Sequence, residues 1–180
     1  MKLSFKTFAA LSIITFTSAF VAVSANWNLD ANYNIRFTGS KVEGTISGLT
    51  GKAIFDPSSL KDALIDVEVD ATSIKTGNSL KDDHAKGSDW LDTEKFPKIK
   101  FRSIEFKTVK EGYEVRGNLE IHGTTKAINI PFQFAQADGK GLFTGKFKID
   151  RKEYGVKGNF MASSMSGEIE IELKIPVTKK

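Results

Sequence analysis

Residues 65–71 read Ile-Asp-Val-Glu-Val-Asp-Ala, so apolar and acidic side chains alternate strictly along this segment. Successive side chains of a β-strand point to opposite faces, and the pattern therefore predicts a strand with one buried face and one wet face. The same alternation recurs in residues 33–37, 128–134 and 169–175. Strands of this kind are typical of antiparallel sheets, because one sheet face packs on the core while the other meets water. We therefore expect an all-β fold.

The alternating segments and the turns between them predict roughly eight strands. These are expected near residues 33–39, 42–48, 50–55, 63–72, 98–107, 113–122, 126–135, 141–151 and 167–176, where the short third segment can continue the second. Gly112, Gly123 and Gly139 fall between segments, as expected for tight hairpins. Within the fifth segment the apolar phase slips near Arg102 or Ser103, which predicts a bulge. A single antiparallel barrel accounts for every strand, although a two-sheet sandwich has the same pattern.

The alternation stops between about residues 76 and 97, which predicts a short helical or irregular insert in the barrel. Asn78 or Ser79 can cap a helix that runs through Lys86, and Pro97 ends the irregular region before the next strand. Irregular segments on a regular scaffold commonly carry function. The insert supplies four candidate residues for a lid or a ligand-binding mouth: Asp83, His84, Trp90 and Phe96.

Glycine occupies the buried phase of three predicted strands, in residues 42–46, 115–119 and 143–147. An inward glycine leaves space in a barrel that is just wide enough to be filled by side chains or to hold one small ligand. Such glycines also mark bends, so the pattern alone leaves a hollow and a solid barrel equally open. In a hollow barrel the ligand-binding wall would be formed by large inward side chains: Phe37, Phe101, Leu119, Phe132, Phe134, Phe143 and Phe147.

Arg151 and His84 are polar residues in unusual places. Arg151 continues the inward phase of its strand, where it could receive the head group of a ligand or pair with Asp82, Asp83 or Asp92. His84, next to the first two of these acids, could serve a small enzyme or redox accessory, or could only fix the insert by hydrogen bonding. The sequence has no cysteine, no HExxH and no GxSxG, so we expect no catalytic residue, metal site or cofactor.

The N-terminus has the composition of a secretory signal peptide. Two lysines precede an apolar run over residues 8–23, and the small residues around 23–25 suit a cleavage site. We expect residues 1–25 to be removed and residues 26–180 to form one exported domain, periplasmic as the first choice and secreted as the second. The net charge of +4 falls by two without the leader lysines. That charge is too weak to indicate a nucleic-acid partner.

Several motifs resemble the signature of the YceI-like family and extend over residues 27–177. In chain order they are Phe55-Asp56-Pro57, Ser73-Ile74-x-Thr76-Gly77-Asn78, Asp83-His84, Trp90-Leu91-Asp92, Phe96-Pro97-x-Ile99-x-Phe101, the turn at 121–126, and Arg151-x-x-Tyr154-Gly155. The resemblance implies an exported, lipocalin-like barrel that holds a polyisoprenoid or similar lipid chain, and it favours the hollow barrel. Many members carry a His-Ser pair where this chain has Tyr33-Asn34, so no role of that histidine is carried over.

The function implied by this resemblance is lipid binding for carriage, storage or an envelope stress response, without bond making. The ligand would be an isoprenoid quinone, a polyprenyl phosphate or a fatty acyl chain, and transient contact with a membrane is expected. The protein would be a monomer or a homodimer. The residues alone indicate only an apolar chain as ligand. Two alternatives stay open: the small enzyme using His84 with Asp82 or Asp83, and a solid barrel that acts as a stress-response interaction module.

Overall fold

The computed structural model describes residues 25–158 and 166–180 as a sheet of nine strands with one α-helix. The strands are β1 (Asn26–Leu29), β2 (Asn34–Thr38), β3 (Glu43–Ile54), β4 (Leu64–Lys75), β5 (Lys98–Val109), β6 (Gly112–Ile121), β7 (Thr124–Ala137), β8 (Lys140–Asp150) and β9 (Glu168–Lys179). The helix α1 (Ser79–Lys86) and the 3-10 turns η1 (Leu60–Asp62) and η2 (Arg151–Tyr154) connect them. The predicted signal peptide lies outside the described residues, except for Ala25.

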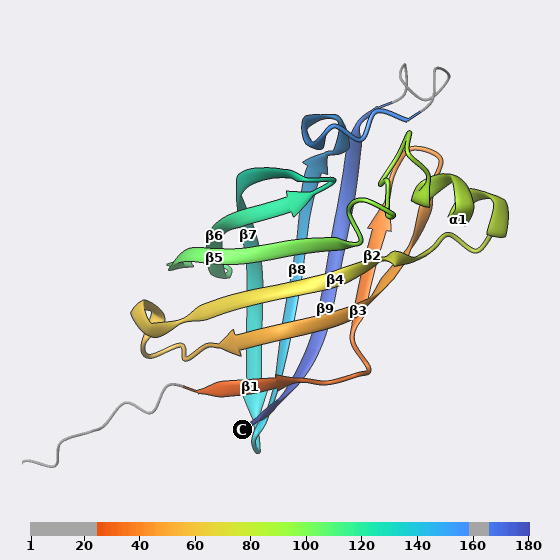
Figure 1. Ribbon diagram of the computed structural model, residues 1–180. Coiled ribbons are helices and arrows are strands. Elements are labelled where there is room, and N and C mark those ends of the chain that lie inside the picture. The colour runs from red at the N-terminus through yellow and green to blue at the C-terminus, as the bar shows by residue number, and fades with distance from the viewer. Residues whose placement is uncertain (1–24, 159–165) are drawn as a thin grey trace, which may run out of the picture.

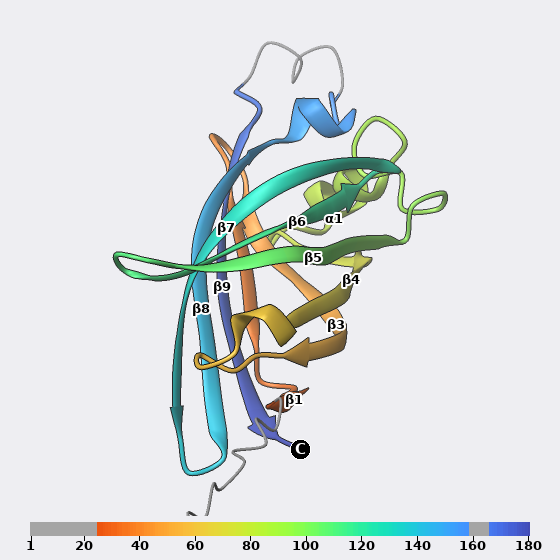
Figure 2. The ribbon, with the colours of Figure 1, turned by 90° about the vertical axis from the view of Figure 1, so that its left-hand side faces the viewer.

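The sheet closes on itself as an antiparallel barrel. Eight strands follow one another in the order β3-β2-β9-β8-β7-β6-β5-β4, and β4 pairs back to β3. This closure confirms the predicted barrel and excludes the two-sheet sandwich. The short β1 pairs with both β3 and β9. Both views place β1 and the C-terminus at one end of the barrel and α1 at the other (Figure 1, Figure 2).

The second and third predicted segments form one strand, β3, as the prediction allowed, with register shifts between Thr45 and Ser47 and between Ser47 and Thr50. The strands otherwise differ from the predicted ones chiefly in two places. The strand β1 was not predicted, because its four residues are too few to show a periodicity. Arg151 does not end β8 as expected; it begins η2, where the side chain of Asp150 accepts a hydrogen bond from the backbone N–H of Lys152.

The predicted bulge in β5 is confirmed. The pairing of β5 with β6 shifts register between Ser103 and Glu105, so the intervening Ile104 has no partner in the ladder. Ile104 is 55% exposed, and it is therefore the bulge residue rather than part of the core. Phe106 returns the apolar face of the strand to the interior, where its ring lies near that of Phe55.

The β1 end of the barrel is filled by aromatic side chains around Phe55, which is fully buried. The rings with centroids 5.1–5.8 Å from that of Phe55 are Phe106, Tyr113, Phe132, Phe134 and Phe143. The indole N–H of Trp27 donates a hydrogen bond to the carbonyl oxygen of Phe55 over 2.9 Å, which ties β1 to this cluster. Aromatic packing of this kind, mostly edge-on, fills this end of the barrel.

Candidate functional site

The barrel encloses a cavity of about 720 Å³ that is lined mainly by aliphatic and aromatic side chains. Its depth follows from the burial along β9. Near the β1 end, Val177 is buried and lies outside the cavity wall, whereas Ile169, Ile171, Leu173 and Ile175 line the cavity. The first three of these are only half-buried although they face inward. The barrel is therefore filled next to Val177 and the Phe55 cluster, and it is hollow toward α1.

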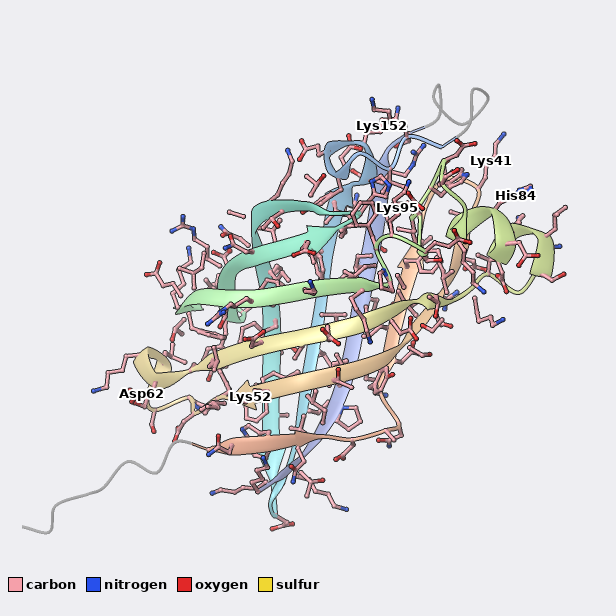
Figure 3. All side chains as sticks on the ribbon, viewed as in Figure 1. Lys41, Lys52, Asp62, His84, Lys95 and Lys152 are labelled. Atoms are coloured by element: carbon pink, nitrogen blue, oxygen red, sulfur yellow. The ribbon has the colours of Figure 1, made fainter. Side chains whose placement is uncertain are left out.

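The cavity reaches solvent at the α1 end. Its wall there includes the exposed side chains of Lys41, on the turn between β2 and β3, and of Lys81 and His84 on α1. Figure 3 shows Lys41 and His84 at this end, with Lys52 and Asp62 at the far end of the barrel. We call the part of the wall at this end the mouth; it is formed by Ser40, Lys41, Thr76, Lys81, His84, Trp90 and the buried Arg151.

All but one of the predicted wall residues line the cavity: Phe37, Phe101, Leu119, Phe132, Phe143 and Phe147. Phe134 does not, because its ring packs in the aromatic cluster, 5.3 Å from the ring of Trp27 and 4.4 Å from that of Phe143. Its strand position is inward but too close to the closed end. Whether the six wall residues bind a ligand stays a prediction.

Two of the three inward glycines do not leave voids of their own. A Cβ on Gly44 would overlap the ring of Phe37, and one on Gly117 would overlap the ring of Phe101 and the carbonyl oxygen of Arg102. At both positions the missing Cβ leaves room for the aromatic ring of the neighbouring strand. Gly145 differs: it lines the cavity, and the nearest atom to a Cβ there would be the carbonyl oxygen of Pro131, 3.0 Å away.

Three of the five residues predicted for the mouth or lid line it: His84, Trp90 and Arg151. Asp83 is exposed on α1 and lies outside the wall, because successive helical residues point in different directions. Phe96 also lies outside the wall, and its ring packs 4.8 Å from that of His122. Sequence reasoning missed Lys41, which is on a turn and belongs to no recognisable pattern.

Arg151 is 7% exposed and joins η2 to the insert. Its Nη1 donates a hydrogen bond to the carbonyl oxygen of Val156, and its guanidinium carbon lies 4.9 Å from the centre of the Trp90 ring. Burial lowers the pKa of Arg151, and the negative charge of Asp150 opposes that shift. A cation above an indole ring is favourable, and more so where water is excluded.

In the part of the chain that the structure describes, none of the three acids proposed as partners of Arg151 forms an ion pair with it. Asp82 lies 3.5 Å from the ammonium of Lys75, and Asp92 lies 2.9 Å from that of Lys95. Asp83 faces solvent. The predicted pairing of Arg151 with one of these three carboxylates is therefore wrong for the described residues.

Asp82 fixes the insert to the end of β4. Its carboxylate accepts hydrogen bonds from the backbone N–H of Thr76 at 2.6 Å and from the Thr76 hydroxyl at 2.7 Å. These hydrogen bonds, with a smaller contribution from Lys75, lower the pKa of Asp82. The Asn78 side chain caps α1 by accepting from the Lys81 N–H, as predicted.

The described residues contain no arrangement typical of an acid–histidine catalytic pair at α1. No hydrogen bond joins His84 to Asp82 or Asp83 there, and Asp82 is already engaged by Thr76. In the same ranges, no group of three or more His, Asp or Glu side chains is placed to hold a metal ion. None of the helices in that part of the chain is long and apolar enough to cross a membrane.

Comparisons with known proteins agree with this architecture. The family model of the YceI-like domain matches residues 23–177. A UPF0312 protein of Pseudomonas savastanoi pv. phaseolicola is 31% identical over 170 residues, which cover 85% of this chain and 88% of the relative. The crystal structure of Burkholderia cenocepacia BcnA superimposes with a TM-score of 0.79 at 23% identity and covers 84% of this chain and 100% of its own.

A second similar structure is that of a polyisoprenoid binding domain from Saccharophagus degradans implicated in plant cell wall breakdown, with a TM-score of 0.63 and 13% identity. It covers 88% of this chain and 100% of its own, and at this identity the likeness shows the fold alone. The family match, which takes in all nine strands up to Val177, gives the assignment its weight. The chain belongs to the YceI-like family.

Proposed function

We propose that the mature protein binds one long apolar lipid chain, of the polyisoprenoid class, inside the barrel. The observation that carries this proposal is the cavity of about 720 Å³, which is apolar within and opens beside α1. Cavities of roughly 300–1,000 Å³ are typical of sites that bury most of a drug-sized ligand. The polyisoprenoid class is supported by the ligand named for the Saccharophagus degradans domain.

The energetics suit such a ligand. Each buried CH₂ group contributes about 0.8 kcal/mol, so ten buried carbons give roughly 8 kcal/mol before ordering costs, or near-micromolar affinity. Half-buried Ile169, Ile171 and Leu173 would lose their remaining contact with water when a chain enters. A lipid tail can therefore be held without any polar contact in the interior.

The role that follows is storage or carriage of the lipid across an aqueous compartment, without a chemical step. We propose that residues 1–25 direct export, so that the compartment is the periplasm and the ligand comes from a membrane. A one-chain cavity with a single mouth suits transfer by transient contact with that membrane. The absence of an acid–histidine pair at α1 in the described residues supports binding over catalysis.

Displacement of a lipophilic fluorescent dye by a polyprenol tests the proposal. Ile171 lines the cavity between β8 and β2, pairing with Phe147 and Phe37, and Ile171→Trp should fill part of the lumen and weaken dye and lipid binding by about tenfold or more. The matched control is Glu172→Trp, at the next, outward position, which should bind as the unmodified protein does. Equal uptake by both variants, or no uptake by the unmodified protein, would contradict a lumen-bound ligand.

A further inference from the structure

We propose that the mouth of the cavity binds the phosphate group of a phosphorylated lipid while the tail lies in the barrel. This inference rests on the proposed function, because it specifies the head group of the chain that the barrel holds. If the inference holds, the protein binds a lipid phosphate more tightly than a neutral alcohol or quinone with the same tail.

The first argument is the sign of the charge at the mouth. Lys41 from the turn between β2 and β3, Lys81 from α1 and Arg151 from η2 belong to three separate elements and line one cavity. Among the described residues the wall contains one acid, Glu68, and it lies 3.3 Å from the ammonium of Lys98. The mouth is therefore cationic.

The second argument is that two of the acids near these lysines are occupied by other cations, while Asp83, also on α1, faces solvent outside the wall. Asp82, next to Lys81, is held by Lys75 and Thr76. Glu43, two residues after Lys41, pairs with Arg36 over 2.7 Å. Within the described ranges neither Lys41 nor Lys81 has an ion-pair partner, so a ligand entering the mouth meets uncompensated positive charge.

The third argument is the match between this charge and a phosphate. A phosphate monoester carries a charge of about −1.5 to −2 near neutral pH and has three acceptor oxygens, which suits several cations on different elements. Ser40 and Thr76 line the same mouth and add hydroxyl groups. A neutral quinone head would leave the charges of Lys41 and Lys81 uncompensated, and a single carboxylate would offset them less.

The Trp90 side chain gives the binding event a local reporter. It lines the mouth beneath the Arg151 guanidinium, whereas Trp27, the second of the two tryptophans, is buried in the aromatic cluster at the opposite end. In a Trp27→Phe background, the emission therefore reports the mouth. Because Trp27 does not line the cavity, the substitution leaves the cavity wall unchanged, and ligand binding can also be measured by calorimetry in this background.

The test compares ligands with one tail and different heads. Farnesyl phosphate should bind about tenfold more tightly than farnesol, because charge-assisted contacts form only with the phosphate, and added salt should narrow that ratio. Lys41→Gln/Lys81→Gln should bring the ratio close to one. Lys52→Gln/Lys61→Gln removes the same charge from exposed positions on β3 and η1 and should preserve the ratio. Figure 3 shows Lys52 at the far end of the barrel.

The outcomes separate the two proposals. If neither farnesyl phosphate nor farnesol binds, the proposed lipid-binding function fails. If both bind equally, or if the ratio survives in the Lys41/Lys81 variant, the lumen holds a lipid and the phosphate proposal is overturned. Inorganic phosphate should bind far more weakly than farnesyl phosphate; equal affinity would instead make the mouth a site for free phosphate and also overturn the proposal.

Discussion

The guanidinium carbon of Arg151 lies 4.9 Å from the centre of the Trp90 ring, and the same side chain donates a hydrogen bond to the carbonyl oxygen of Val156. These contacts join η2 and the segment after it to the insert that contains α1. Arg151 is 7% exposed yet lines the cavity, so one residue both holds the mouth together and faces whatever enters it. Its structural and binding roles must therefore be separated by experiment.

Replacing Arg151 with alanine should lower the free energy of unfolding by about 1–3 kcal/mol, because the buried Val156 carbonyl loses its donor. Chemical denaturation followed by far-UV circular dichroism measures the change. The matched control is Arg102→Ala. The Arg102 side chain is 74% exposed, and its ion pair with Asp66, at 3.8 Å, is open to solvent. The control should change stability by no more than about 0.5 kcal/mol. Equal effects of the two substitutions would remove Arg151 from its structural role.

The aromatic cluster around Phe55 should be the most sensitive part of the barrel. Phe55→Ala removes a fully buried ring that contacts five others, and a loss of about 3–5 kcal/mol is expected. Ile104→Ala is the comparison, because this bulge residue is 55% exposed and should lose far less. Urea midpoints of both variants check the prediction. A cost for Phe55→Ala below that of Ile104→Ala would show that the closed end is not packed as described.

Alanine at the two inward glycines Gly117 and Gly145 should have different costs. A Cβ at Gly117 would overlap the Phe101 ring and the Arg102 carbonyl oxygen, whereas at Gly145 the nearest atom would be the carbonyl oxygen of Pro131, 3.0 Å away. Gly117→Ala should therefore destabilise the barrel by about 1–3 kcal/mol and displace the Phe101 ring from the cavity wall. Gly145→Ala should cost less. Thermal unfolding of both variants measures the order, and a reversed order would refute the close approach at Gly117.

The insert should loosen in acid through Asp82. Because the hydrogen bonds from Thr76 hold the folded-state pKa of Asp82 below its ordinary value of 3.8, its stabilising contribution is present above that value. The contribution is lost as the pH falls from 3.8 through the lowered folded-state pKa. Asp82→Asn should therefore be less stable than the unmodified protein at neutral pH, and the difference should shrink in acid.

Urea unfolding at pH 7 and at pH 3 measures this effect. The neighbouring Asp83→Asn serves as control, because Asp83 faces solvent on α1 and should alter stability little at either pH. A stability difference between Asp82→Asn and the unmodified protein that stays constant from pH 7 to pH 3 would contradict the role of the Asp82 carboxylate.

Most of the barrel could be predicted from alternation alone, because a strand with one buried face exposes its period directly in the sequence. The pairing partners and the closure could not, since the same pattern serves a sandwich. The bulge was visible because Phe101 and Phe106 lie on opposite phases of one strand. The four-residue β1 was too short to show a period, although Trp27 anchors it to the closed end.

The candidate site was predicted less completely, because strand phase gives direction but not depth. Phe134 and Phe132 share a phase and a strand, yet only Phe132 lines the cavity, since Phe134 lies one pleat closer to the filled end. Lys41 lies at the mouth only because the pairing of β2 with β3 places the turn between them at the end of the barrel that carries α1. Residues brought together from distant turns leave no local signal.

The central claim is that the barrel of the protein contains a bound lipid chain in the cell. Native mass spectrometry of the mature protein, purified from its own envelope under conditions that keep bound lipid, tests this claim most directly. We predict a mass above that of the polypeptide by one long-chain lipid per chain, which organic extraction removes. A mass equal to that of the bare polypeptide in every preparation would contradict the account.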